Sequence, residues 1–302
     1  MTTHATGPLA GLTWLKRGVN LGRQNARAVF GGAAILMVMW LMPGLVQVAL
    51  LSALQPGPVG TSVIGALATL LALFLLMPLV GGYLRVIEAS EAGRAVHATD
   101  IFAPFRHVAE LGRFVGFGAI MSVASTALFL ALLWLVGDGV AEWFDKVMAL
   151  SMSGAKVEPA QIPQAPESLG RLVFLGSLLG LVLSGVYALG LGQIALGRRP
   201  VREALVDGVK GTFKNLIPML VLAIVVFLLS IVLGVVLALA VGLISVVGKL
   251  VGMTVATVLV LVSYFALIIA LYVVLFGVMY YFWRDVCDGQ EPPPLRNDQV
   301  AL

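Results

Sequence analysis

Long apolar runs constrain this chain more than any other feature. Between Leu172 and Gly197 there is no Asp, Glu, Lys, Arg or His. A helix needs roughly 20 residues to cross a hydrocarbon core of about 30 Å, and this run is long enough. The composition agrees, because 60% of the residues are hydrophobic and 11% are charged, against about 25% charged in a soluble domain. The sequence therefore predicts an integral membrane protein.

Comparable runs recur along the chain, so we expect an all-α polytopic membrane bundle with six transmembrane helices. The last two runs exceed the length that a bilayer needs and are expected to tilt or to project into water, with a tight turn near residues 245–252 between them. A short amphipathic helix followed by a Pro-rich stretch is expected between the third and fourth spans, over residues 137–170. The predicted spans are residues 28–54, 62–84, 114–136, 172–196, 216–244 and 253–283.

A basic amphipathic segment, here called an elbow, precedes each odd-numbered span, at residues 12–27, 101–113 and 200–215. In the third elbow, Pro200 supplies a helix start, and apolar and charged residues then fill opposite faces, as in a helix lying in the membrane interface. Each even-numbered span ends with two glycines twelve residues apart, namely Gly81 and Gly93, Gly185 and Gly197, Gly277 and Gly289. The two patterns together predict three repeats of elbow plus helical hairpin, over about 12–99, 100–199 and 200–284.

Both ends of the chain are polar. We expect residues 1–11 and 285–302 to be disordered and residues 12–284 to form the membrane domain. No cleaved signal peptide is expected, because the first 27 residues are polar and basic and no cleavage site follows an early apolar core. The single cysteine, Cys287, excludes a framework of intramolecular disulfides.

The basic residues predict how the spans are oriented. Only Lys146, Lys156, Arg171 and Lys249 fall on one side of the predicted spans, and all other lysines and arginines fall on the other side. The positive-inside rule then puts both termini and all three elbows in the cytoplasm. There each Lys or Arg attracts anionic lipid by about 1 kcal/mol. The predicted lipid-headgroup residues are Lys16, Arg23, Arg27, Arg198, Arg199, Arg202, Lys210 and Lys214.

Small residues form a stripe along the fourth span. They fall at every fourth position, which places them on one narrow face of a helix. Such a face lets a second helix approach closely in a membrane, where no hydrophobic effect drives helices together. We therefore expect the stripe to pack against another helix of the same chain. Its members are Gly176, Gly180, Ser184, Ala188 and Gly192.

No motif for catalysis, cofactor binding or metal binding is found. Residues 190–195 formally match a dinucleotide-binding pattern, but the pattern requires a loop after a strand, and here it lies inside a predicted span. The three histidines are scattered in polar segments, without metal-ligand spacing. Ion-coupled transporters usually keep ionisable residues inside their spans, and the six span interiors hold none. The sequence therefore predicts a protein that is not an enzyme, with no catalytic residue, cofactor or metal.

Two segments of the C-terminal third carry a resemblance to a known family. Residues 200–218 follow the pattern P-x-x-A-L, a basic helix, then N-x-x-P, and an aromatic-Arg-Asp signature follows the last span. The chain in this respect resembles a family of uncharacterised bacterial six-helix inner-membrane proteins. It is more distantly similar to the membrane domain that accompanies glycerophosphodiester phosphodiesterases. The resemblance implies a six-helix fold and no established activity. The matching residues are Pro200, Ala204, Leu205, Asn215, Pro218, Tyr281, Arg284 and Asp285.

Two classes of function remain open at this point. The first is a non-catalytic membrane protein that organises the bilayer, or binds anionic lipid, a membrane-protein partner or a second copy through its basic elbows. The second is a passive transporter or channel for a lipid-like or small apolar solute. A continuous polar path between the spans would favour transport. Nothing in the sequence indicates a nucleic-acid partner.

Overall fold

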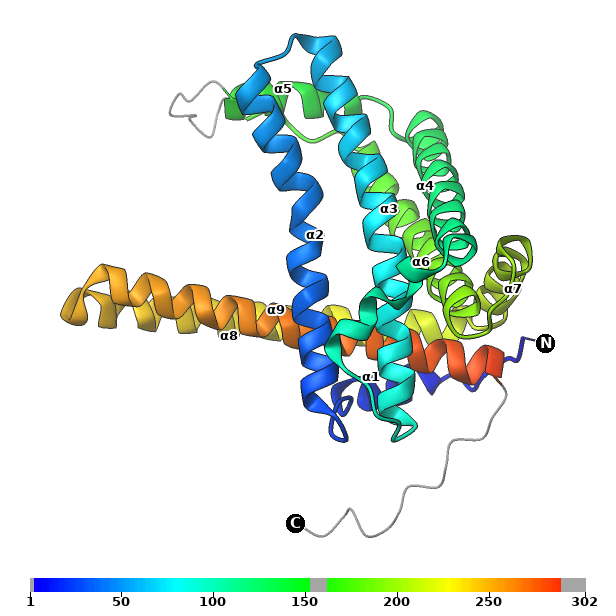
Figure 1. Cartoon of the computed structure of the whole chain (residues 1–302). Helices are drawn as coiled ribbons and strands as arrows, with labels where there is room; N and C mark the ends of the chain where they lie inside the picture. Colours follow the sequence, from blue (N-terminus) through cyan, green and yellow to red (C-terminus); the bar gives the residue numbers. More distant parts are fainter. Residues whose placement is uncertain (1–2, 153–161, 289–302) are drawn as a thin grey trace. The chain divides into compact units, whose positions relative to one another are not determined.

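The computed structural model describes residues 3–152 and 162–288, and these residues form helices and no strand (Figure 1). The chain divides into two compact units. The larger unit comprises Met1–Gly118 and Gly185–Leu302, and the smaller one comprises Ala119–Ser184. The boundaries cut through two long helices, so each unit contains part of both. The two units are described separately below.

Six helices of the described residues are long and apolar enough to cross a membrane. The predicted all-α six-span fold is therefore confirmed, and the chain is a multi-pass membrane protein. The predicted threefold repeat stays a prediction. The six helices are α2 (Ala26–Leu54), α3 (Pro58–Glu91), α4 (Val108–Val136), α6 (Ser168–Ala195), α8 (Leu216–Val251) and α9 (Met253–Trp283).

Three span ends differ from the prediction. Helix α3 continues past residue 84 to Glu91. Helix α8 continues to Val251, where a turn was expected from residue 245 onward. Gly252 alone separates α8 from α9, and its φ of 109° is one that glycine adopts readily. A π-helical turn, η3 (Arg284–Asp288), extends α9 into the segment expected to be disordered, and residues 289–302 of that segment lie outside the described residues.

The three elbows take two different forms. The first and third are the α-helices α1 (Ala10–Val19) and α7 (Val201–Lys214). The second is a 3₁₀-helix, η1 (Ala98–Arg106), and the remainder of the predicted elbow already belongs to α4. Pro104 lies inside η1 and has no N–H to donate to an α-helical ladder. The second elbow is consequently shorter than the other two.

Each elbow of the larger unit packs on a glycine of an even-numbered span. A Cβ on Gly82 of α3 would clash with the backbone carbonyl of Ile101 in η1. A Cβ on Gly185 of α6 would lie 2.8 Å from the side chain of Thr212 in α7. A Cβ on Gly277 of α9 would lie 2.9 Å from the Cα of Gly18 in α1. Small residues therefore allow the elbows to contact the span ends directly.

Hydrogen bonds to distant residues hold the described part of the N-terminal segment, although residues 1–11 were expected to be disordered; residues 1–2 lie outside the described residues. Asn215, which is fully buried, accepts a hydrogen bond of 2.7 Å from the backbone N–H of Thr6 and donates one of 2.9 Å to the carbonyl of His4. The N–H of His4 donates to the carbonyl of Val286 at 2.9 Å. These partners are more than 200 positions away, so composition alone could not reveal them. Residues 3–9 have no regular structure, and α1 begins at Ala10.

A network that we call the Asp285 clamp holds α1 against the end of α9. Asp285 accepts hydrogen bonds from the Trp14 indole at 2.9 Å and from Arg17 at 3.1 Å. The guanidinium of Arg284 lies 4.8 Å from the centre of the Tyr281 ring. The Tyr281 hydroxyl donates in turn to Glu91 of α3. Tyr281, Arg284 and Asp285, which carry part of the family resemblance, thus join three helices of the larger unit.

The smaller unit contains the expected short amphipathic helix, α5 (Val140–Met152). The Trp143 indole donates to the carbonyl of Pro163 at 3.0 Å, and the Ser168 hydroxyl donates to the carbonyl of Asp138. The first bond ties the segment that follows α5 back to α5, and the second ties the start of α6 to the turn that precedes α5. Residues 153–161 of the Pro-rich stretch lie outside the described residues, and residues 162–167 are irregular up to the turn that starts α6.

The small-residue stripe of α6 is not packed along its whole length. A Cβ on Gly192 would lie 2.5 Å from the Trp283 ring, so that end is tightly packed. A Cβ on Gly176 would make ordinary contacts at 3.9 Å, and a Cβ on Gly180 would meet no described atom within 4 Å. Ser184 is exposed. The expected continuous buried stripe is thus limited to its C-terminal part.

Candidate functional site

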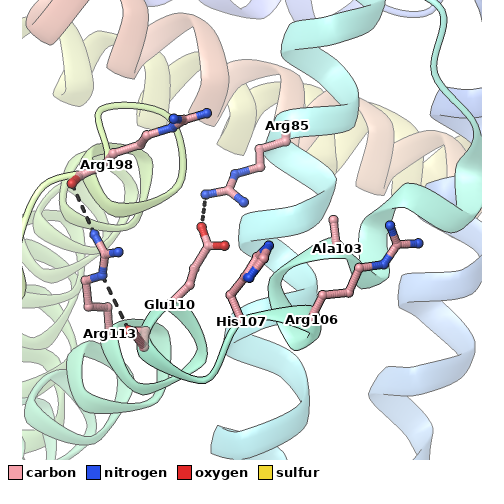
Figure 2. A pocket seen from close by; sticks show the side chains of 8 residues that line it. Arg85, Ala103, Arg106, His107, Glu110, Arg113 and Arg198 are labelled. Carbon is pink, nitrogen blue, oxygen red and sulfur yellow. Dashed lines mark hydrogen bonds and ion pairs between the residues drawn. The ribbon is translucent and has the colours of Figure 1, made fainter.

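An open pocket of about 430 Å³ lies in the larger unit, and arginines from four separate segments line it (Figure 2). Arg85 comes from α3, Arg106 ends η1, Arg113 lies in the second turn of α4, and Arg198 follows α6. Glu110 and His107 complete the charged or ionisable part of the lining. We call this group the arginine pocket.

Two adjacent glycines of α3 bring the walls of the pocket together. Gly82 leaves room for the η1 backbone at Ile101, and Gly81 leaves room for the ring of Phe114 on α4. Arg85 follows one helical turn later, and its guanidinium lies 6.0 Å from the centre of the same ring. The close approach of η1 and α4 to this end of α3 therefore brings Arg85 together with residues of both elements in the lining of the pocket.

Arg85 joins α3 to two other helices. Its Nε donates to the carbonyl of Ala195, the last residue of α6, at 2.7 Å. Its Nη2 forms an ion pair with the carboxylate of Glu110. Figure 2 shows the Glu110 carboxylate pointing to Arg85. Both side chains are mostly buried, with 26% and 17% of their surfaces exposed, so Arg85 has a structural role and also faces the pocket.

Arg198 has an unusual backbone conformation. Its φ is 54°, in the left-handed region, which costs a residue with a Cβ about 1–2 kcal/mol. Its carbonyl accepts a hydrogen bond of 3.2 Å from Arg113, which fixes the loop (Figure 2). Strained conformations of this kind often occur at functional sites. The strained backbone and the charged side chain thus occur at the same position of the pocket.

The charges of the pocket are not balanced. Four arginines face one glutamate, so the formal net charge is 4 − 1 = +3 with His107 neutral. The side chains of Arg106 and Arg198 form no hydrogen bond or ion pair with any described residue, and both residues are exposed. Arginine remains protonated in proteins, so these charges cannot be relieved by losing a proton. An anion placed among them would reduce their mutual repulsion.

Only one predicted lipid-headgroup residue, Arg198, lines this pocket. Arg199 pairs with Glu203 at 2.8 Å, and Lys214 donates to the carbonyl of Thr3 at 2.7 Å. The remaining predicted residues are exposed and do not line the pocket; they are Lys16, Arg23, Arg27, Arg202 and Lys210.

Arg85, Arg106 and Arg113 were not predicted as site residues, because their positions in the sequence indicate only how the spans are oriented. A signal for Arg85 was present: it follows the pair Gly81–Gly82 at the end of a span, where close packing was to be expected. Pairing of Arg85 with Glu88 on the helix surface would have been the simplest expectation. Instead Glu88 pairs with Arg94 at 3.0 Å, and Arg85 pairs with Glu110.

The donor set is suited to binding phosphate or carboxylate. Guanidinium groups offer forked hydrogen-bond donors that match the geometry of these anions. No group of three or more His, Cys, Asp or Glu side chains with metal-site geometry occurs among residues 3–152 and 162–288. The arrangement can therefore hold and orient an anion between α3, η1, α4 and the loop after α6.

Comparisons with known proteins give no match. No family model matches the chain. No curated protein and no solved structure matches it. The resemblance seen in residues 200–218 and 281–285 therefore stays a prediction, and the function is argued from the pocket itself.

Proposed function

We propose that this multi-pass membrane protein binds the headgroup of an anionic lipid in the arginine pocket and acts without catalysing a reaction. The observation that carries the proposal is the formal charge of +3 in a pocket of about 430 Å³. That volume lies within the roughly 300–1,000 Å³ of small-molecule sites. The expected ligand is a phosphate-bearing headgroup, because arginine binds phosphate through two parallel hydrogen bonds.

The location of the pocket supports a lipid ligand. Its walls come from the C-terminal part of α3, from η1, from the N-terminal end of α4 and from the loop after α6. Helices α3, α4 and α6 are candidate spans, and we expect the ends of spans to lie at the depth of the headgroups. Anionic lipids give the cytoplasmic leaflet a negative surface potential, which attracts each Lys or Arg by about 1 kcal/mol. By the positive-inside rule, we infer that the pocket faces the cytoplasm, as expected for a bacterial inner membrane.

A headgroup in this pocket would connect segments that are distant in sequence. Arg106 and Arg198 come from different elements that line the same pocket, and neither side chain has a described partner, so both charges are available to attract the headgroup. Such a lipid would stabilise the packing of η1 against the loop after α6. Lipid binding would in this way determine how the spans associate, which fits a role in organising the bilayer or a partner within it.

The test compares two double variants that remove equal charge. Arg106→Gln with Arg198→Gln removes two pocket arginines that have no described partner, so no buried group loses a bond. The control is Arg23→Gln with Arg27→Gln, because both arginines are exposed and lie outside the pocket. Each protein is purified in mild detergent, and its retained lipid is measured by native mass spectrometry.

The pocket variant should retain at least about tenfold less anionic lipid than the parent, since two phosphate contacts of about 1 kcal/mol each are lost. The control should retain lipid almost as the parent does. An equal loss in both variants would mean that lipid is attracted by the basic surface as a whole, and the proposal for this pocket would fail.

A further inference from the structure

A second pocket, of about 300 Å³, adjoins the arginine pocket and shares Arg85, Ala103 and Arg198 with it. Its other charged residues are Glu88, Arg94 and Asp100. We call it the side pocket. Because two arginines line both pockets, a ligand whose phosphate binds these arginines can extend from one pocket into the other.

The two pockets differ in charge. The side pocket holds three arginines and two carboxylates, so its formal charge is 3 − 2 = +1, against +3 in the arginine pocket. It therefore has a weaker attraction for a second anion. It contains two carboxylates, Glu88 and Asp100, whereas the arginine pocket contains one, Glu110. The side pocket therefore offers hydrogen-bond acceptors next to arginine donors.

Both carboxylates of the side pocket can accept additional hydrogen bonds. Glu88 pairs with Arg94 at 3.0 Å through one oxygen, and 41% of its side chain is exposed. Asp100 accepts from the backbone N–H of His97 at 2.8 Å, also through one oxygen, and 45% of its side chain is exposed. An ionised carboxylate has about four lone-pair sites, so each retains acceptor capacity towards a ligand.

We propose that the ligand is a phospholipid headgroup with hydrogen-bond donors beyond its phosphate, in the form of hydroxyl or amine groups on the esterified alcohol. This inference rests on the proposed lipid-binding function. The phosphate binds in the arginine pocket near Arg85 and Arg198, and the alcohol reaches Glu88 and Asp100 in the side pocket. A headgroup without donors leaves the side pocket unused.

Two lipids of equal charge test this recognition. Phosphatidylglycerol and phosphatidylmethanol are both phosphodiesters with one negative charge, and they differ in the two hydroxyl groups of the glycerol. Each is titrated against the full-length protein in nanodiscs of phosphatidylcholine, and binding is followed by native mass spectrometry. Hydrogen bonds to charged groups are stronger than those between neutral groups. We therefore expect phosphatidylglycerol to bind at least about tenfold more tightly.

A paired variant, Glu88→Gln with Asp100→Asn, assigns the preference to the side pocket. The amides keep an oxygen for Arg94 and for the His97 N–H, so the local structure is retained. The preference for phosphatidylglycerol should largely disappear, while phosphatidylmethanol should bind no more weakly than to the parent. Loss of binding to both lipids would indicate damage to the fold and would count against the assignment.

The outcomes separate this inference from the proposed function. Equal binding of the two lipids by the parent protein overturns the inference and leaves the lipid site intact. Failure of both lipids to bind above phosphatidylcholine overturns the proposed function itself. Soluble glycerophosphoglycerol forms a further arm: if it binds as tightly as phosphatidylglycerol, the recognition chemistry holds and the site belongs to a free solute.

Discussion

Arginines lie at the ends of several spans of the larger unit, and two groups of them differ in what surrounds their charge. In the Asp285 clamp, Arg17 pairs with a carboxylate and Arg284 lies against an aromatic ring. In the arginine pocket, Arg106 and Arg198 have no described partner. The charges of the first group are engaged in contacts that hold α1 against α9. The second has charge available for an anion inside a pocket, which is the basis of the proposed lipid site.

The largest expected effect comes from breaking the clamp. Asp285→Ala removes the carboxylate that accepts hydrogen bonds from Trp14 and Arg17. The ion pair is mostly buried, since 26% of the Arg17 side chain and 19% of the Asp285 side chain are exposed. Removing one member of a buried ion pair costs about 3–5 kcal/mol, and the partial exposure reduces this to about 2–3 kcal/mol. The free energy of unfolding should fall by that amount in a detergent denaturation assay.

The control for this change is Glu203→Ala. It removes an ion pair of similar length with Arg199, but 52% of the Glu203 side chain is exposed. Exposed pairs contribute about 0–1 kcal/mol, so little stability should be lost. If both variants lose the same small amount, the clamp is no more than a surface pair, and the contrast between the two groups of arginines disappears.

A second change makes the contrast sharper. Glu110→Gln removes the only carboxylate of the arginine pocket, which raises its formal charge from +3 to +4. Arg85 keeps its bond to the carbonyl of Ala195, so stability should fall by only about 1 kcal/mol. Anionic lipid should bind about fivefold more tightly, since one repulsive charge of about 1 kcal/mol is lost.

Glu142→Gln provides the matched change of charge, because this exposed glutamate lies in the first turn of α5 and outside the pocket. Lipid binding is measured for both variants in the same nanodiscs. An unchanged affinity in Glu110→Gln would show that the carboxylate and the lipid do not compete for Arg85.

The spans could be predicted from sequence because each is encoded locally. Runs such as residues 173–196 have no charged residue over the thickness of a bilayer, and no tertiary contact is needed to recognise them. The elbows were harder, because Pro104 makes the second one a 3₁₀-helix. The end of α8 was predicted too early, because the glycines and the lysine near residues 248–252 are typical of a turn. In the structure, the positive φ of Gly252 alone is enough to separate α8 from α9.

The site could be predicted only in part, because it depends on contacts between distant residues. Gly81 and Gly82 bring α4 and η1 close to α3, and Arg113 connects α4 to Arg198 through its carbonyl; the spacing of residues along the chain does not indicate these contacts. Of the pocket arginines, Arg198 alone was predicted to bind a headgroup. The stripe on α6 shows the same limit, since periodicity defines a face of a helix but not what lies opposite it.

The smallest expected effect concerns the backbone at Arg198. Arg198→Gly removes the guanidinium and also relieves the left-handed conformation, whose φ is 54°. The relief of about 1–2 kcal/mol is partly offset by the greater freedom of glycine in the unfolded chain, about 0.5–1 kcal/mol. Stability should therefore rise by up to about 1 kcal/mol while the affinity for anionic lipid falls about fivefold.

Two further variants separate the backbone from the side chain at Arg198. Arg198→Ala removes the guanidinium and keeps the strain, so it should lose the same affinity without gaining stability. Gln55→Gly relieves a similar conformation, with a φ of 42°, far from the pocket in sequence, and should gain stability without losing lipid. If Arg198→Gly instead keeps full lipid affinity, Arg198 serves only the loop through its carbonyl. The unpaired charge of the pocket would then rest on Arg106, and a single unpaired arginine would no longer distinguish the pocket from the exposed elbows.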